Sequence, residues 1–351
     1  MSVIEDKLKD KHNDKIDYDK LLEKFPWINE KDRYCVLSPD SDGLLCGLLM
    51  AKMRNWKIVG FYDDKVGVIQ KDYLSKDLVF LDGEIFRKNV KSVGHHMLKL
   101  NKNSTVDFSN FDNCIQPNLL RNYDGKHDFR LKYPLATVHL LVSILSYADY
   151  KNDLNVIKLD EKALAPLFFT DGVFNVLFSY PENVLNWLSY LRINEEWNPL
   201  KNIFENEVYS VFTTMKLMNE FFRRRDEISA SKERGDRLKI SSKDGEPYNI
   251  EMASNGSYKI NDDAKDRIEK FLKLIGDMTT WKYLENDWQC WNNLQYYKFS
   301  KDDFKKRGWT MKNADFEKFI ALNPLSWAMT SGENIEFTLE YPSKFDFDNE
   351  K

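Results

Sequence analysis

Three short apolar runs between residues 34 and 82 constrain the fold of this chain most. They read YCVLS, KIVGFY and LVFLD, and charged or turn-forming residues bound each of them. Short runs rich in Val, Ile and aromatic residues are typical of buried β-strands. Between the first two runs, GLLCGLLMAKMRN has the apolar content of a buried helix. A strand, a helix and a second strand in this order predict a parallel sheet with crossover helices.

The pattern along the chain therefore predicts an α/β protein with several parts. A long amphipathic stretch, PLKNIFENEVYSVFTTMKLMNEFFRRRDEI, indicates a helix that connects an N-terminal α/β domain to a smaller α+β domain. We expect four segments: a charged N-terminal helical extension at 1–30, the parallel-sheet domain at 31–195, the connector helix at 196–235 and the C-terminal α+β domain at 236–351.

Two local patterns describe the C-terminal domain more closely. Asn255-Gly256 stands between two short strand-like runs and predicts a β-hairpin. Trp281, Trp288 and Trp291 recur with leucines at intervals of three or four residues, which predicts the buried face of a helix rather than a base-stacking surface.

Composition limits the classes of function. The net charge of −4 and the pI near 5.9 argue against a protein that coats nucleic acid with a basic surface, although they allow a local basic groove. The first residues, MSVIEDKLKDKHNDK, lack the apolar core of a signal peptide. Apolar runs fall short of the roughly 18 residues that a membrane span requires. These features predict a soluble cytoplasmic protein that does not bind membranes.

Acidic residues and a histidine pair gather after the predicted strands. Asp40 and Asp42 follow the first strand in SPDSDG, and Asp82 ends the third. Because the chemistry of such sheets collects at the carboxyl ends of the strands, these carboxylates are expected to meet. His95-His96 follows a further short run, and Asp171 lies in an apolar segment, where an ionised acid needs a partner. Carboxylate oxygens bind hard divalent cations such as Mn²⁺ or Mg²⁺, and Mn²⁺ also takes imidazole.

Four motifs then resemble those of the DHH phosphoesterase superfamily. VLSPDSDG, VFLDGE, SVGHH and PLFFTDG occur in the family's order, and CIQPN resembles the Asn-Pro region that follows its Asp-His-His signature. The resemblance covers about residues 33–190. It implies a DHH-like fold for this part of the chain and hydrolysis of phosphate esters with two divalent ions, Mn²⁺ or Mg²⁺.

The resemblance also implies roles for individual residues. Asp40, Asp42, Asp82, His95 and Asp171 would be metal ligands, with Asp82 bridging the two ions. His96 would face the substrate phosphate, so the catalytic set is His96 with Asp40 and Asp42. Independently of the resemblance, Arg121 and Arg130 follow the histidine pair closely, near the expected cleft, and are predicted to contact substrate beside His96.

This sequence departs from the family pattern at two motif positions. Gly94 stands where the family has the Asp of Asp-His-His, and Val36 where some branches carry a metal-binding histidine. The region after residue 200 has no Gly-Gly-Gly-His run like that in the family's nucleic-acid-cutting enzymes. Substrate contacts of the C-terminal part therefore do not transfer.

The functional hypothesis is a metal-dependent phosphodiesterase or nuclease. It would hydrolyse single-stranded nucleic acid or short or cyclic oligonucleotides by metal-activated water. The alternative is a catalytically inactive DHH-like scaffold, or a nucleotide-binding subunit of a larger assembly, because Gly94 removes support for the ligands. A phosphatase or pyrophosphatase for a small substrate is a third reading. Homo-oligomers or protein complexes are compatible with each.

Overall fold

The computed structural model describes residues 14–229 and 235–340. Residues 1–13 of the predicted N-terminal extension lie outside the described residues, as do 230–234 of the connector and the last eleven residues, 341–351. The described part of the extension contains helix α2 (Tyr18–Lys24) and a 3-10 turn at Pro26–Asn29. Helix α2 packs against α6 (Thr137–Lys151), so the extension is part of the folded body.

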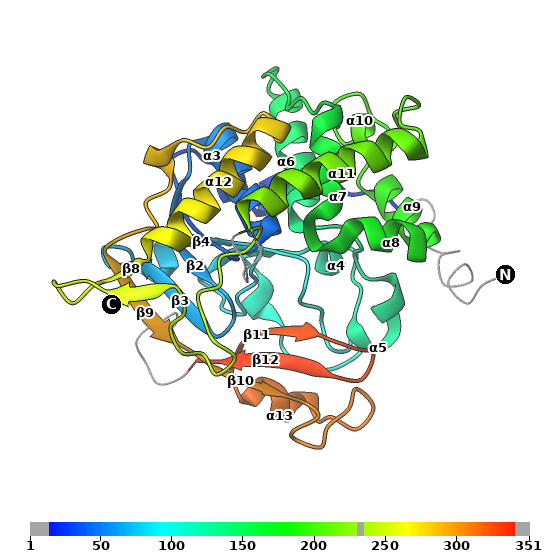
Figure 1. Ribbon diagram of the computed structural model, residues 1–351. Helices are drawn as coiled ribbons and strands as arrows, with labels where there is room; N and C mark the ends of the chain where they lie inside the picture. Colours follow the sequence, from blue (N-terminus) through cyan, green and yellow to red (C-terminus); the bar gives the residue numbers. More distant parts are fainter. Residues whose placement is uncertain (1–13, 230–234, 341–351) are drawn as a thin grey trace.

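A mixed sheet forms the centre of the molecule (Figure 1). In the described residues it has nine strands in the order β6-β5-β4-β1-β2-β3-β9-β8-β7. The first five in this order are parallel, and the remaining neighbours pair antiparallel. The three apolar runs form β1, β2 and β4, so the predicted α/β class with a parallel sheet is confirmed. The strands are β1 (Tyr34–Leu37), β2 (Lys57–Tyr62), β3 (Val66–Gln70), β4 (Leu78–Leu81), β5 (Lys91–Val93), β6 (Cys114–Ile115), β7 (Ile250–Met252), β8 (Tyr258–Ile260) and β9 (Leu294–Lys298).

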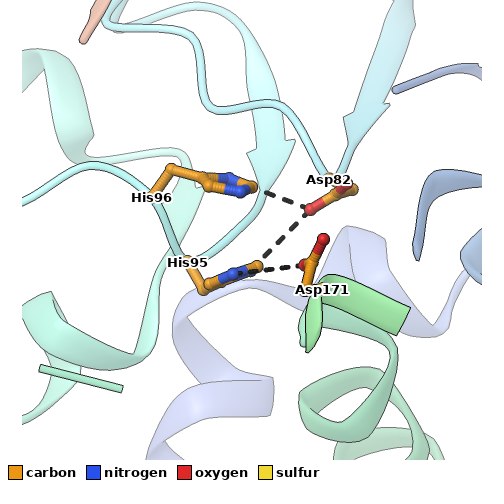
Figure 2. Close-up of side chains that lie close together, drawn as sticks. All are labelled: Asp82, His95, His96 and Asp171. Atoms are coloured by element: carbon orange, nitrogen blue, oxygen red, sulfur yellow. Dashed lines mark ion pairs between the residues drawn. The ribbon is translucent and has the colours of Figure 1, made fainter. Parts of the chain in front are cut away.

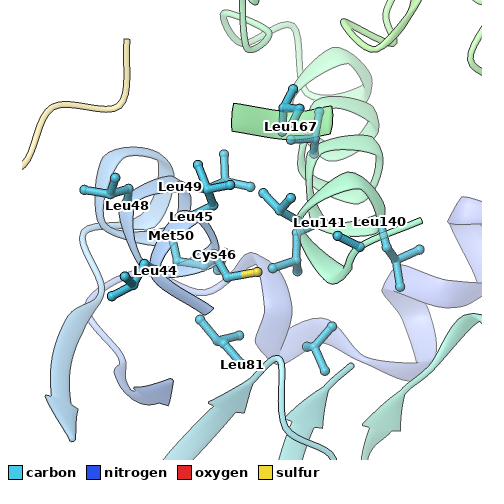
Figure 3. Packing of buried hydrophobic residues seen from close by; sticks show 14 of the residues in the cluster. Leu44, Leu45, Cys46, Leu48, Leu49, Met50, Leu81, Leu140, Leu141 and Leu167 are labelled. Carbon is cyan, nitrogen blue, oxygen red and sulfur yellow. The ribbon is translucent and has the colours of Figure 1, made fainter. Parts of the chain in front are cut away.

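Helix α3 (Ser41–Arg54) is the predicted crossover between β1 and β2, and it is buried along most of its length. It packs against α6 and the C-terminal helix α12 (Asp262–Thr279). Figure 3 shows its Leu45 and Leu49 beside Leu141 of α6, with Leu81 of β4 below them. Burial of such side chains stabilises the fold by about 1.5–3 kcal/mol each, which fixes the start of α3 against the sheet edge.

The described chain has further helices besides α2, α3, α6 and α12. The predicted connector contains α11 (Val211–Ile228), which packs against α7 and α12. The remaining helices in the described residues are α4 (Pro117–Leu120), α5 (Gly125–Asp128), α7 (Leu164–Phe169), α8 (Val173–Ser179), α9 (Pro181–Tyr190), α10 (Lys201–Phe204) and α13 (Phe316–Ala321).

The segment predicted as one C-terminal domain divides between two sheets. Strands β7, β8 and β9 extend the central sheet, because β9 pairs with β3. A separate antiparallel sheet has the order β10-β12-β11 and lies below the central sheet in Figure 1. Its strands are β10 (Ser300–Asp303), β11 (Pro324–Met329) and β12 (Ile335–Leu339). Trp327 of β11 packs with Phe86 and Phe111, so this sheet rests on the loops that follow β4 and β5.

One local prediction for this region is confirmed and the other is wrong in part. Asn255-Gly256 joins β7 to β8 in an antiparallel hairpin, with Gly256 at a φ of 75°. The tryptophans at 281, 288 and 291 are buried as expected. However, α12 ends at Thr279, and the tryptophans lie in an irregular segment that leads into β9. Their spacing reflects burial on the sheet rather than a helical repeat.

No single helix in the described ranges is both long and apolar enough to cross a membrane. One bent pair, Glu161–Ser179 with Pro181–Tyr190, meets that test by length and composition only.

Gly43 provides a test of the packing at the start of α3. A Cβ at this position would lie 2.0 Å from the carbonyl oxygen of Ser38. We expect Gly43→Ala to lower the free energy of unfolding by about 1–3 kcal/mol, the usual effect of overpacking, measured by urea denaturation. Gly332→Ala is the control, since its nearest neighbour would be Phe129 at 3.8 Å. Equal losses for both variants would contradict this account.

Candidate metal centre

The carboxyl ends of three parallel strands bring the candidate residues together. Leu37 at the end of β1 is paired with Leu81 of β4, and Leu81 with Val93 of β5. The residues that follow these strands therefore emerge at one sheet edge, as the sequence predicts. The loop after β1 begins α3, Asp82 follows β4 directly, and the histidine pair follows β5 one residue later.

Four side chains form a cluster that could hold a metal ion: Asp82, His95, His96 and Asp171. Each offers a ligand atom, and these atoms all lie within 4.8 Å of one another. His95 Nε2 is 3.4 Å from Asp171 Oδ2, and His95 Nδ1 is 3.7 Å from Asp82 Oδ1. Figure 2 shows the two imidazole rings side by side, facing both carboxylates. The donor set therefore has two oxygen and two nitrogen donors converging on one point.

Both aspartates of this cluster have an unusual backbone conformation. Asp82 has a φ of 57° and Asp171 a φ of 50°, in the left-handed region. Aspartate and asparagine adopt this region more readily than other non-glycine residues. Asp171 lies at the kink between α7 and α8, where Thr170 Oγ1 is 3.1 Å from Ser41 Oγ at the start of α3. This hydrogen bond holds the turn that carries Asp171 beside the loop after β1.

Asp42 has a structural role that the sequence did not predict. Its Oδ2 accepts a hydrogen bond from Thr137 N at 2.7 Å, and its Oδ1 accepts one from Val138 N at 3.0 Å. Asp42 thus caps α6, whose own N-cap residue, Ala136, has no side chain to do so. Asp42 Oδ2 also lies 3.9 Å from His95 Nδ1. Its assignment as a metal ligand stays a prediction.

Asp40 caps its own helix and lies beside the cluster rather than in it. Its Oδ1 accepts a hydrogen bond from Gly43 N at 3.3 Å, at the start of α3. The side chain lines a cavity together with Asp82 and His96. Its roles as ligand and catalytic residue remain predictions.

The acids of the site destabilise one another's charged forms. Burial raises the pKa of Asp82, and the nearby charges of Asp42 and Asp40 raise it further. The pKa of Asp171 is raised in the same way by burial and by the charges of these two acids. Burial likewise raises the pKa of Asp42. Carboxylates in this arrangement are stabilised by a cation, which is what a divalent ion would supply.

The two histidines differ in charge although they are neighbours. Burial, followed by the positive charge of His96, lowers the pKa of His95 well below its ordinary value, so this imidazole is neutral. Burial also opposes a charge on His96, but its hydrogen bond to Glu84 and the acids around it raise the pKa of His96 to about 10. A neutral imidazole can bind a metal ion, whereas a cationic one attracts an anion.

Thr137, the first residue of α6, is a member of the site that sequence reasoning missed. Its Oγ1 donates a hydrogen bond to Asp82 Oδ1 at 2.8 Å and lies 2.8 Å from His95 Nδ1. When Asp82 is ionised, the hydroxyl hydrogen goes to its carboxylate, and the neutral His95 donates to Oγ1 through Nδ1. Its Nε2 is then unprotonated and directed at Asp171. Thr137 therefore sets the tautomer that a metal ligand requires.

Two cavities meet at His96. The acidic cavity, of about 140 Å³, is lined by Asp40, Asp63, Asp64, Asp82 and Glu84, with Arg237 and residues of β11. The aromatic cavity, of about 690 Å³, is lined by Phe129, Arg130, Lys132, Tyr133, Tyr180 and Asn183, with Asp171 and both histidines. His96 lines both. Arg237 was missed because it follows a segment that resembles a simple linker.

The two predicted substrate arginines lie in different surroundings. Arg130 is exposed and lines the aromatic cavity. Arg121 is buried; its Nε donates to Asp14 Oδ2 at 2.8 Å, and its guanidinium lies over the rings of Trp187 and Tyr190. Arg121 does not belong to the lining of either cavity. We therefore leave it out of the proposed site.

Comparisons of the chain with protein-family models, curated proteins and solved structures found no match. The resemblance to the DHH superfamily rests on the four sequence motifs alone.

Thr137 can be tested by removing its hydroxyl at constant shape. We expect Thr137→Val to weaken Mn²⁺ binding by about 10–100-fold, the range seen when support for a ligand is removed, because His95 loses its Nδ1 acceptor. Thr137→Ser keeps the hydroxyl and should bind nearly as tightly as the parent. Isothermal titration calorimetry measures both, and equal affinity of the valine variant would refute the role assigned to Thr137.

The raised aspartate pKa values predict the pH dependence of metal binding. Acids with a raised pKa keep their protons at pH values above 3.8, the ordinary value, so a cation must displace them. Mn²⁺ affinity should therefore rise as the pH rises above 3.8 through the raised values, with proton release visible as a buffer-dependent binding enthalpy. Asp171→Asn should flatten this dependence. Affinity that is constant or falls with pH would contradict the assignment.

Proposed function

We propose that this protein is a divalent-metal-dependent phosphodiesterase of DHH type that acts on single-stranded nucleic acid or on short or cyclic oligonucleotides. The observation that carries the proposal is the convergence of Asp82, His95, His96 and Asp171 at the edge of a parallel sheet, with their ligand atoms within 4.8 Å of one another. The order of the four motifs along the chain supports it as well.

The donor set suits Mn²⁺, or Mg²⁺, which favour carboxylate oxygen ligands. Asp82, Asp171 and the neutral His95 would hold one ion. Asp40 and Asp42 would supply further oxygens, and Asp82 would be shared with a second ion. The mutual repulsion of these acids supports the proposal, because a cation removes it. Such ions, when bound, polarise a phosphate ester and lower the pKa of coordinated water.

His96 would bind the phosphate of the substrate. Its imidazole is 40% exposed, compared with 12% for that of His95, and it lines both cavities. A cationic imidazole beside a phosphate stabilises the negative charge that develops on its oxygens during hydrolysis.

The aromatic cavity would bind the organic part of the substrate. Phe129, Tyr133 and Tyr180 offer ring surface, on which nucleobases stack. Asn183 is only 4% exposed, and its Oδ1 has no hydrogen-bond partner, so it could accept from a ligand N–H group. Burial lowers the pKa of Lys132, whose Nζ lies over the Phe129 ring. With Arg130, it supplies positive charge for a further phosphate.

The test is Mn²⁺-dependent hydrolysis of labelled single-stranded DNA, single-stranded RNA and a generic phosphodiester. We expect Asp82→Asn and Asp171→Asn to reduce the rate by about 100-fold or more, since a bound cation contributes several kcal/mol of charge stabilisation. Asparagine tolerates the left-handed backbone of both positions, so folding should persist. Asp42 is unsuitable for this test, because its replacement also removes the cap of α6.

Asp153→Asn is the matched control. Asp153 also has a left-handed backbone, with a φ of 54°, but it is exposed just beyond the C-terminal end of α6. The substitution Asp153→Asn should therefore leave the rate of hydrolysis unchanged. If the unmodified protein binds Mn²⁺ but cleaves none of the three substrates, the proposed phosphodiesterase activity is wrong. A parent that neither binds Mn²⁺ nor cleaves would favour the inactive scaffold.

A further inference from the structure

Gly94, immediately before the histidine pair, is required for its lack of volume rather than for its backbone conformation. Its φ is outside the left-handed region, in contrast to Gly172, Gly245, Gly256 and Gly308. A Cβ on Gly94 would lie 2.5 Å from both Cδ and Oε2 of Glu84. Another side chain has therefore taken the space beside position 94, and that side chain ends in a carboxylate.

Glu84 reaches this position from the loop after β4. It is 3% exposed, and its Oε1 accepts a hydrogen bond from Met97 N at 2.9 Å. Its Oε2 lies 3.5 Å from His96 Nδ1. One carboxylate thus contacts the backbone just after the histidine pair and the ring of its second histidine. A buried carboxylate needs such partners, and the orientation of an imidazole is set by the group that its Nδ1 faces.

We propose that Glu84 is a positioning residue for His96, and that it occupies the space that a carboxylate at position 94 would otherwise fill. Glu84 accepts the Nδ1 hydrogen of His96 and fixes the plane of the ring, so that Nε2 is the nitrogen left for a ligand. That this orientation serves to bind a substrate phosphate rests on the proposed function. That Glu84 orients the His96 ring does not. Gly94 is then the counterpart of Glu84 and not the mark of an abandoned site.

The proposal predicts that the carboxylate can be moved from position 84 to position 94. Gly94→Asp alone should be destabilised, because its side chain collides with Glu84. Glu84→Ala should release His96, and the double variant Glu84→Ala/Gly94→Asp should restore its partner, because the new carboxylate enters the emptied volume. Neighbouring substitutions that compensate in this way are non-additive. A general packing role for Glu84 predicts no such rescue.

The first readout is the ¹⁵N chemical shift of the His96 imidazole in the metal-free protein, which reports whether Nδ1 carries a hydrogen. We expect the unmodified protein and the double variant to carry a hydrogen on His96 Nδ1. In Glu84→Ala, the preference for a hydrogen on Nδ1 should be lost. Glu84→Gln is a second variant that keeps the shape and an acceptor for Met97 N, so it should fold. It should also shift the His96 signals, because its amide can donate to Nδ1. His96 signals that stay unchanged in both Glu84→Ala and Glu84→Gln would overturn the proposal.

The second readout is the rate of Mn²⁺-dependent hydrolysis of labelled single-stranded DNA and RNA. Glu84→Ala should lose about tenfold or more, and the double variant should recover most of the loss. Suppose that the double variant folds but has the same His96 ¹⁵N shift and the same hydrolysis rate as Glu84→Ala. This result would overturn the claim that a carboxylate at position 94 can replace the one at position 84. If the unmodified protein cleaves neither of these nor the generic phosphodiester, the proposed function fails, while the ¹⁵N shifts still decide the role of Glu84.

Discussion

The burial of Asp42, Asp82 and Asp171 close to one another is the constraint on which the rest of the site depends. Folding brings these acids to one sheet edge. The packing of α3 against α6 places Asp42, Asp82 follows β4 directly, and the turn between α7 and α8 carries Asp171. Their raised pKa values are the cost of that placement. The protein offsets part of it with N–H groups and a hydroxyl from the start of α6. The unfavourable free energy that these hydrogen bonds do not offset favours the binding of a cation.

The start of α6 joins the stability of the fold to the chemistry of the site. Ala136 cannot cap this helix with its side chain, so Asp42 does so from α3, which is 95 residues earlier in the chain than Thr137. The helix dipole favours a negative charge at this end. Thr137 then uses its side chain on Asp82 and His95 while its backbone N–H holds Asp42. Stability and metal binding are therefore expected to respond together to changes at these residues.

Features that depend on short stretches of sequence could be predicted, whereas features that depend on tertiary packing could not. The strands before Asp82 and the Asn255-Gly256 hairpin follow from short patterns of burial and turn chemistry, and the structure contains them. The cap that Asp42 supplies to α6 and the contact of Glu84 with Gly94 depend on packing between distant segments, which one sequence does not reveal. The same limit explains why β9 was not expected to join the central sheet and why buried tryptophans were assigned to a helix.

The unequal cavities on the two sides of His96 bear on the class of substrate. The acidic cavity, of about 140 Å³, has room for little more than cations and a phosphate group. The aromatic cavity, of about 690 Å³, lies within the 300–1,000 Å³ that is usual for small-molecule sites. Inorganic pyrophosphate would need only the first and would leave the rings and the unpartnered amide oxygen of Asn183 unused. An ester whose phosphate carries an aromatic organic group uses both, which favours a phosphodiesterase over a pyrophosphatase.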